Sequence, residues 1–253
     1  MKYAIVTGAS KGLGAAVGHH LLDHDYHLVD VSRSGNQELQ QKAENMRLTY
    51  RHANVDLTSP EDAQSFVSEW FDERNDYPPE QILIVHNAGM VEPIETVGQL
   101  DRKAVDQAVH LNYLTPVVVT NEAFKRAGEL NVPLTVVNIT SGAADKPNHG
   151  WSVYGSTKAA LNLFTETAGL EQNELNSKNM IISFSPSVMD TAMQGVIRSS
   201  SEDAFAQVER FKELKEQNKL RSPDQVGGAL VQLLIKDELK NGALYHINDI
   251  LKS

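Results

Sequence analysis

The sequence predicts an α/β protein with a doubly wound, mostly parallel sheet, and three features of its 253 residues support this class. Apolar runs of strand length alternate with helical patterns along almost the whole chain, which is typical of successive βαβ units. A glycine-rich turn joins the first strand to the first helix. No repeat, low-complexity tract or Gly/Ser-rich linker interrupts the series. We therefore expect one domain over residues 1–253, with seven strands and helices on both faces of the sheet.

Short apolar runs bounded by turn residues predict strands at Lys2–Thr7, His27–Ser32, Leu48–Ala53, Ile82–Asn87, Leu134–Thr140, Ile181–Ser185 and Gly242–Ile247. Helical patterns between them predict helices near Gly12–His24, Asn36–Met46, Pro60–Phe71, Asp101–Ala127, Tyr154–Glu171 and Pro223–Ile235. The third helix has a clear start, because Ser59 is a favourable N-cap and Pro60 suits the first helical position.

The composition excludes several classes of function. The formal charge is −10 and Lys and Arg form no cluster, so we expect no nucleic-acid partner. Because the chain has no cysteine, it has no disulfide, thiolate nucleophile or cysteine metal site. The nine histidines show no ligand spacing, and we expect no metal. The opening MKYAIVTG is too short for a signal peptide or a membrane span, so we expect a cytoplasmic protein without a membrane partner.

Gly8, Gly12 and Gly14 lie between the first predicted strand and the first predicted helix, in the segment TGASKGLG. Glycines at such a junction allow a tight turn and a close approach of the backbone to a pyrophosphate, whose charge is favoured at a helix N-terminus. The spacing G-x-x-x-G-x-G differs from the common G-x-G-x-x-G and from a P-loop. The alternative is an ordinary glycine-rich turn. Its place in the first βα unit favours dinucleotide binding in a Rossmann-type domain.

The segment from Asn138 to Lys158 joins the end of a predicted strand to the start of a helix through a polar loop. Tyr154 and Lys158 are four residues apart, which places them on one helix face about 5–6 Å apart. A unit charge roughly 4 Å from the phenol contributes about 4 kcal/mol at an effective dielectric near 20, enough to lower the phenol pKa from about 10 toward roughly 7. Ser141, at the mouth of the strand, is expected to steady the oxygen that Tyr154 protonates. The alternative is a solvated surface pair.

With TGASKGLG at residues 7–14 and YGSTK at residues 154–158, the sequence resembles the classical short-chain dehydrogenase/reductase family. Further family signatures occur in order along the chain, namely Asp56, Asn87-Ala88-Gly89, Asn112 and Ser141. The resemblance implies a catalytic tetrad of Asn112, Ser141, Tyr154 and Lys158. Together with the glycine loop and the second strand, it predicts a cofactor site formed by Gly8, Ser10, Lys11, Gly12, Leu13, Gly14, Ser32, Arg33, Asp56, Leu57, Asn87, Ala88, Gly89, Tyr154, Lys158, Val188 and Thr191.

The chemistry that the resemblance implies is hydride transfer from a reduced nicotinamide to the carbonyl carbon of a small molecule. Tyr154 would protonate the carbonyl oxygen, and Ser141 would donate a positioning hydrogen bond. Lys158 would lower the tyrosine pKa and hold the nicotinamide ribose, while Asn112 would bind a water that links the lysine to solvent. The rival from another class is a regulatory protein that binds a dinucleotide without catalysis. The complete tetrad favours the enzyme.

The second predicted strand bears on the choice of cofactor. An NAD-dependent enzyme of this fold places an acid at the end of that strand, where it accepts a hydrogen bond from the ribose 2′-hydroxyl. Here the strand ends at Ser32, and Arg33 follows with a planar guanidinium that suits a phosphate. Lys11 adds a positive charge in the glycine loop. These residues favour NADP(H), and the competing interpretation makes Asp30 the acid.

One departure from the family pattern follows the sixth strand, where Ser187 stands in place of the usual glycine. The resemblance implies that the backbone of this turn contacts the nicotinamide carboxamide, with Val188 and Thr191 at the contacting positions. A serine fits the turn if its φ is negative and otherwise strains it.

The segment of about residues 190–221 follows this turn. It contains the capping-box pattern Ser-Ser-Ser-Glu at residues 199–202 and then apolar residues at helical spacing from Phe205 to Leu214, which predict a helix. This segment is either a surface helix packed on the body of the protein or a mobile lid over the substrate.

Within the family, SPSVMDTAMQ and IRSSS resemble the sepiapterin reductase branch, in particular bacterial benzil reductases that form (S)-benzoin. This resemblance implies reduction of one carbonyl of an aromatic or vicinal diketone in an apolar pocket that includes Trp151, Val188 and Met189. Asp190 is the candidate polar anchor for the substrate, and its alternative role is a helix-start cap. A sepiapterin-like or other ketone substrate stays open.

Family members commonly pair through the helices predicted here at Asp101–Ala127 and Tyr154–Glu171. We therefore expect a homo-oligomer, most simply a dimer. Small residues that would permit close helix packing are Ala159, Ala160, Ala168 and Gly169. The alternative is that these residues pack against the protein's own sheet.

Overall fold

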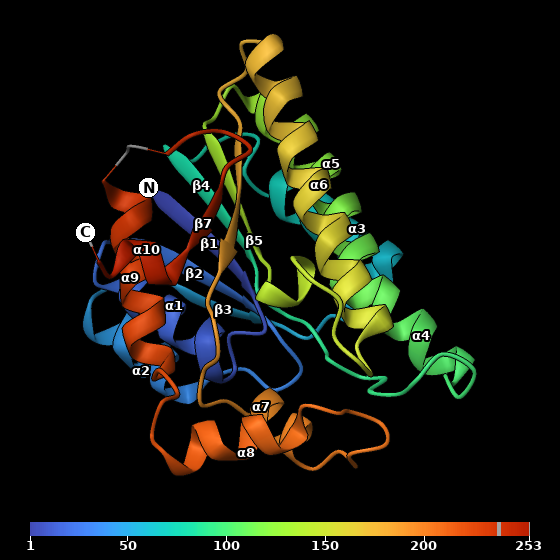
Figure 1. Cartoon of the computed structure of the whole chain (residues 1–253). Coiled ribbons are helices and arrows are strands. Elements are labelled where there is room, and N and C mark those ends of the chain that lie inside the picture. Colours follow the sequence, from blue (N-terminus) through green and yellow to red (C-terminus); the bar gives the residue numbers. More distant parts are fainter. Residues whose placement is uncertain (237–238, 253) are drawn as a thin grey trace.

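The computed structural model describes residues 1–236 and 239–252, and its centre is a sheet of seven parallel strands in the order β3-β2-β1-β4-β5-β6-β7 (Figure 1). The strand order reverses between β1 and β4, and open α/β sheets bind ligands at this point. The predicted fold class is confirmed. The strands are β1 Lys2–Thr7, β2 Tyr26–Val31, β3 Tyr50–Ala53, β4 Gln81–His86, β5 Leu134–Ile139, β6 Met180–Ser185 and β7 Leu244–His246.

Helices cover both faces of this sheet (Figure 1). Helices α1, α2 and α9 pack on one face, and α3, α5 and α6 pack on the other. The helices are α1 Gly12–Leu22, α2 Gln37–Asn45, α3 Pro60–Asp72, α4 Arg102–Val109, α5 Thr115–Leu130, α6 Ser152–Glu174, α7 Ala192–Arg198, α8 Val208–Glu216, α9 Pro223–Ile235 and α10 Ile247–Ile250.

The central strands are apolar on both sides. In β1, Ala4 and Val6 face the cluster that includes α1 and α9, while Ile5 faces the cluster under α3 and α5. Parallel strands covered on both faces require such continuous apolar runs. This burial explains why the strand positions were predictable from the sequence.

Two predicted helices differ from the structure. The long helix expected at Asp101–Ala127 is divided into α4, a π-helical turn at His110–Leu114, and α5. The helix expected to begin at the serine pattern of residues 199–202 begins instead at Val208. Ser201 does accept a hydrogen bond, from the backbone N of Ala204 at 3.2 Å, but this bond closes a turn and does not begin a helix.

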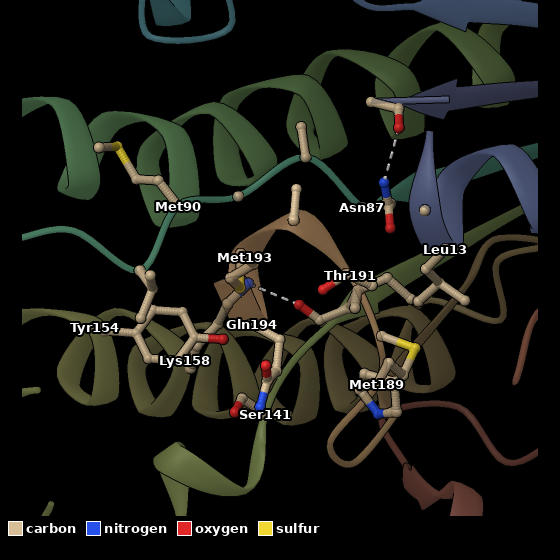
Figure 2. A pocket seen from close by; sticks show the side chains of 18 of the residues that line it. Leu13, Asn87, Met90, Ser141, Tyr154, Lys158, Met189, Thr191, Met193 and Gln194 are labelled. Atoms are coloured by element: carbon tan, nitrogen blue, oxygen red, sulfur yellow. Dashed lines mark hydrogen bonds between the residues drawn. The ribbon is translucent and has the colours of Figure 1, made fainter. Parts of the chain in front are cut away.

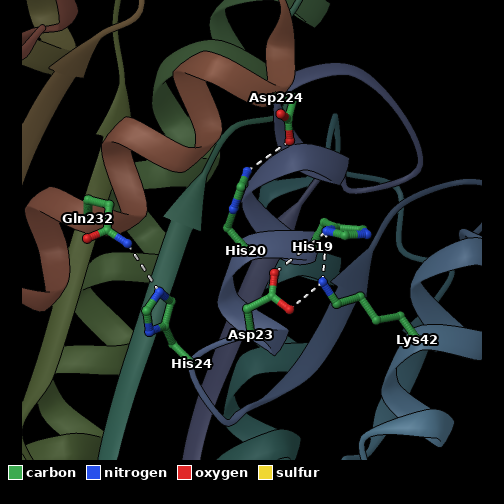
Figure 3. Close-up of polar contacts among 7 residues, drawn as sticks. All are labelled: His19, His20, Asp23, His24, Lys42, Asp224 and Gln232. Atoms are coloured by element: carbon green, nitrogen blue, oxygen red, sulfur yellow. Dashed lines mark hydrogen bonds and ion pairs between the residues drawn. The ribbon is translucent and has the colours of Figure 1, made fainter.

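The neighbouring histidines at the end of α1 take part in contacts between helices (Figure 3). His20 lies 2.9 Å from a carboxylate oxygen of Asp224, at the start of α9. Asp23 pairs with Lys42 of α2 at 2.6 Å. Within the described residues, no group of three His, Cys, Asp or Glu side chains is arranged to hold a metal ion. In the same part of the chain, no helix has the length and apolarity needed to span a membrane.

Candidate active site

A cavity of about 1490 Å³ opens at the carboxyl ends of the central strands. Pockets for small molecules commonly measure about 300–1,000 Å³, so this one has room for a dinucleotide and a substrate together. Nearly all of the predicted cofactor and substrate residues line it, including Trp151, Met189 and Asp190. Gly14 and Asn112 do not line it, and both are buried.

The glycine loop has the conformation that its sequence predicts. Gly8 and Gly12 have φ values of +71° and +61°, which favour glycine. A Cβ atom on Gly14 would lie 2.4 Å from the Gly8 carbonyl oxygen and 2.5 Å from Nδ2 of Asn87. Gly14 therefore allows α1 to pack against the turn. The loop and the N-terminus of α1 at Gly12 form a cradle that suits a pyrophosphate.

Thr7, whose role was not predicted from the sequence, stabilises this cradle through hydrogen bonds. Its Oγ1 accepts hydrogen bonds from the backbone N of Asn87 and of Ala88, both at 2.9 Å. Asn87 in return donates from Nδ2 to the carbonyl oxygens of Thr7 (2.9 Å) and Gly8 (3.2 Å). The hydroxyl at the end of the first strand, directly before the first glycine, was the available signal.

The residues proposed to distinguish NADP(H) from NAD(H), Asp30 on one hand and Ser32 with Arg33 on the other, lie at the end of β2 in different surroundings. Asp30 is fully buried, and its Oδ2 accepts a hydrogen bond from the hydroxyl of Tyr50 at 2.7 Å. It does not line the cavity, whereas Ser32 and Arg33 do. Asp56 also lines the cavity, and hydrogen bonds from Thr58 hold the pKa of its carboxyl below the ordinary value, with a further contribution from the Arg33 charge.

Three predicted catalytic side chains meet at one side of the cavity. Figure 2 shows Ser141, Tyr154 and Lys158 grouped there, with Leu13 and Asn87 on the other side. Tyr154 and Lys158 are both buried, at 7% and 5% exposure. The spacing of Tyr154 and Lys158 on α6 therefore places them together at the cavity wall and not on the protein surface.

The predicted direction of the tyrosine pKa is wrong. Burial raises the pKa of Tyr154, and a hydrogen-bonding interaction with Ser141 opposes this rise only in part. Lys158 donates from Nζ to the backbone carbonyl of Ile139 at 2.8 Å, and burial lowers its own pKa to about 8. Helical spacing predicted that the two groups are neighbours, but it could not predict the burial of the phenol, which raises its pKa.

Asn112 lies in the π-helical turn and is fully buried. Its Nδ2 donates to the carbonyl oxygen of Met90 at 2.8 Å and to Thr157 at 3.3 Å, and its Oδ1 accepts from the backbone N of Met90 at 2.9 Å. A Cβ atom on Gly89 would lie 3.1 Å from Asn112 Oδ1 and 3.7 Å from Lys158 Nζ. The structure therefore brings Asn112 and Lys158 together around Gly89.

Ser187 has a φ of +61°, in the left-handed region that favours glycine. This conformation costs an L-residue about 1–2 kcal/mol, and the turn is therefore strained. Val188 follows it against a buried apolar cluster. Thr191, at the start of α7, places its methyl group 3.8 Å from the position that a Cβ on Gly12 would take. The turn after β6 thus closes over the glycine loop.

The segment of residues 190–221 packs over the cavity through four aromatic rings, which we call the aromatic cluster: Trp151, Tyr154, Phe205 and Phe211. Trp151 stacks on Phe205 with ring centroids 4.6 Å apart and meets the edge of Tyr154 at 5.6 Å. The segment therefore packs on the body of the protein and contributes residues to the cavity wall, while its role as a mobile lid stays a prediction.

Asp190 is not the cap of α7, because Thr191 occupies the N-cap position. Its carboxylate accepts from Nζ of Lys215 at 2.6 Å, and its backbone N donates to the carbonyl oxygen of Arg221 at 3.0 Å. These contacts join the beginning of the 190–221 segment to its end.

Comparisons with known proteins agree with this geometry. A family model described as short chain dehydrogenase matches residues 2–202. Benzil reductase ((S)-benzoin forming) from Bacillus subtilis (strain 168) is 39% identical over 99% of this chain and 100% of its own length. Sepiapterin reductase from Bos taurus is 27% identical over 94% of this chain and 91% of its own length. The crystal structure of the KRED1-Pglu enzyme, 28% identical, covers 96% of this chain and all of its own with a TM-score of 0.79.

Three observations point to the same family: the sequence motifs, the parallel sheet and the full-length match to reductases. The chain belongs to the short-chain dehydrogenase/reductase family.

Proposed function

We propose that this protein is an NADPH-dependent carbonyl reductase that reduces one carbonyl of an aromatic or vicinal diketone, with benzil to (S)-benzoin as the model reaction. The observation that carries the proposal is that Ser141, Tyr154 and Lys158 line one cavity and that Tyr154 also belongs to the aromatic cluster. The name of the Bacillus subtilis relative supports the substrate class. The aromatic cluster supplies apolar surface suited to aryl groups.

The family binds nicotinamide dinucleotides, and the glycine cradle fits their pyrophosphate. NADP(H) is supported by three residues at the cavity wall, Lys11, Ser32 and Arg33. Arg33 suits a 2′-phosphate, and Asp30 is hydrogen-bonded to Tyr50 away from the cavity. When bound, the reduced cofactor supplies hydride, and the protein supplies position and proton transfer.

The residues of the chain have distinct tasks in this scheme. Tyr154 protonates the carbonyl oxygen, and its raised pKa keeps the phenol protonated at neutral pH, as a general acid requires. Ser141 donates a hydrogen bond to the same oxygen. Lys158 holds the nicotinamide ribose, and Asn112 links it to solvent through a water. We also propose that residues 1–253 form one domain and that residues 190–221 act as its lid.

The charge of Lys158 sets an expected pH dependence. Because burial lowers its pKa to about 8, the side chain is protonated at pH 7 and loses its charge as the pH rises through about 8. We expect kcat/KM for NADPH, which reports the free enzyme, to be level below this pKa and to fall above it. Lys158→Arg should remove that fall, since a guanidinium stays charged. A level profile through pH 9 in the unmutated protein would contradict this role.

A dimer through α5 and α6 is the expected assembly. Leu163 and Leu170, seven residues apart on α6, are 65% and 58% exposed. Gly169 serves its own chain instead, because a Cβ there would lie 2.3 Å from the backbone N of Gly242. We expect sedimentation to give twice 27.9 kDa for the unmutated protein and 27.9 kDa for the double variant Leu163→Glu, Leu170→Glu. An unmutated particle of 27.9 kDa would exclude the dimer.

A panel of ketones tests the proposed substrate class. Benzil, other 1,2-diketones, sepiapterin and simple aryl ketones are compared by kcat/KM with saturating NADPH. We expect the aromatic diketones to rank first. If sepiapterin ranks first, the protein is still a carbonyl reductase, but the proposed diketone substrate class is wrong.

A further inference from the structure

Trp151 carries a buried hydrogen-bond donor that the protein leaves unpaired. Its side chain is 8% exposed, and its indole Nε1 has no acceptor among residues 1–236 and 239–252. An unpaired buried donor costs about 1–3 kcal/mol. Nε1 itself has almost no exposed surface, so a substrate oxygen reaches it only when Phe205 and Phe211, which pack against the indole ring, shift. Trp151 lines the cavity, and its ring lies 5.6 Å from that of Tyr154.

Within the described part of the chain, two other cavity-lining side chains have a buried polar atom without a hydrogen-bond partner, and both are less suited to bind a carbonyl oxygen. Gln194 donates from Nε2 to the carbonyl oxygen of Phe211 at 3.1 Å, which fixes its unpaired Oε1 as an acceptor. An acceptor cannot bind a carbonyl oxygen. Thr140 has an unpaired hydroxyl but lies outside the aromatic cluster. Trp151 is a pure donor within that cluster.

We propose that the indole N–H of Trp151 donates a hydrogen bond to the second carbonyl oxygen of a vicinal diketone, while Tyr154 and Ser141 donate to the first. This inference rests on the proposed function. Trp151 is the N-cap residue of α6, three positions before Tyr154, and the two rings lie 5.6 Å apart. A diketone therefore meets a donor at each oxygen. A monoketone of the same shape leaves the indole N–H unpaired, and Trp151 thereby selects diketones.

The test compares benzil with deoxybenzoin, which has the same two phenyl groups and one carbonyl. The quantity measured is the ratio of their kcat/KM values with saturating NADPH, in the unmutated protein and in Trp151→Phe. Phenylalanine keeps a ring to stack on Phe205 and removes the N–H. Loss of one such hydrogen bond is expected to lower the ratio about tenfold. Benzil is intrinsically more reactive than deoxybenzoin, but this difference affects the ratio equally in both proteins. It therefore cancels when the ratio of the variant is compared with that of the unmutated protein.

Trp70 provides a matched control. It is fully buried in α3, and its Nε1 also has no acceptor among the residues that the structure describes. It belongs to the core under the sheet and does not line the cavity. Trp70→Phe loses the same group and is expected to leave the ratio unchanged. Trp151→His, which keeps a ring N–H, is expected to retain part of the preference and serves if Trp151→Phe does not fold.

The outcomes separate this inference from the function on which it rests. An equal loss of kcat/KM for both substrates in Trp151→Phe would make Trp151 an apolar wall and overturn the inference. The same follows if Trp70→Phe lowers the ratio as much. Reduction of deoxybenzoin without reduction of benzil overturns the inference and leaves carbonyl reduction in place. If neither compound is reduced, the proposed function itself fails.

Discussion

Tyr154→Phe is expected to lower kcat for benzil reduction by about 10²–10⁴-fold, the usual contribution of a positioned general acid. The substitution removes one hydroxyl from a buried side chain and leaves the ring, which packs edge-on against Trp151. Affinity for NADPH should therefore stay within about twofold. Steady-state kinetics gives kcat, and titration of NADPH fluorescence gives Kd.

Tyr26 offers a matched control for this variant. It is as buried as Tyr154, at 7% exposure, and its hydroxyl donates to Gln81 at 3.0 Å, away from the cavity. Tyr26→Phe should leave kcat unchanged. If Tyr154→Phe keeps more than about a tenth of the activity, Tyr154 is not the general acid.

Arg33→Asp is expected to produce the second large effect, on the choice of cofactor. Hydrogen bonds to charged groups contribute about 1.5–3 kcal/mol, and an aspartate would also repel a 2′-phosphate. Since 1.4 kcal/mol corresponds to a factor of ten, the ratio of kcat/KM for NADPH to that for NADH should fall by about 100-fold. The assay uses one diketone at a saturating concentration.

Arg47 is an exposed arginine that does not line the cavity, so Arg47→Asp controls for the change in net charge. That variant should keep the cofactor ratio of the unmutated protein. If the unmutated protein prefers NADH, the argument from Arg33 and Lys11 fails and Asp30 becomes the discriminating residue, despite its hydrogen bond with Tyr50.

The fold was predictable because its determinants are local. Strands buried on both faces appear as apolar runs, and β1 was placed at its observed bounds, as was α9. The break in the long helix was not predictable, because it accompanies contacts of Asn112 with Met90, 22 residues away. The start of α8 was missed for a related reason, since a capping pattern does not show whether a helix or a turn follows.

The positions of the site residues were predictable from sequence motifs. Their protonation and backbone conformation were not, because these depend on the surrounding structure. The spacing of Tyr154 and Lys158 predicted neighbours but carried no information about burial, which reverses the expected direction of the tyrosine pKa. The sequence also left open the conformation of Ser187, whose positive φ comes from the surrounding turn. Local patterns thus determine which residues meet, and tertiary packing determines their protonation.

We expect this protein to reduce a diketone at the cavity and not merely to bind a dinucleotide there. Incubation of the purified protein with benzil and NADPH, followed by the loss of NADPH absorbance and by chiral chromatography, tests it most directly. We expect sustained turnover with one (S)-benzoin formed for each NADPH consumed. Binding of NADPH without consumption, for benzil and for every other carbonyl compound tried, would contradict the claim and make the protein a dinucleotide-binding regulator.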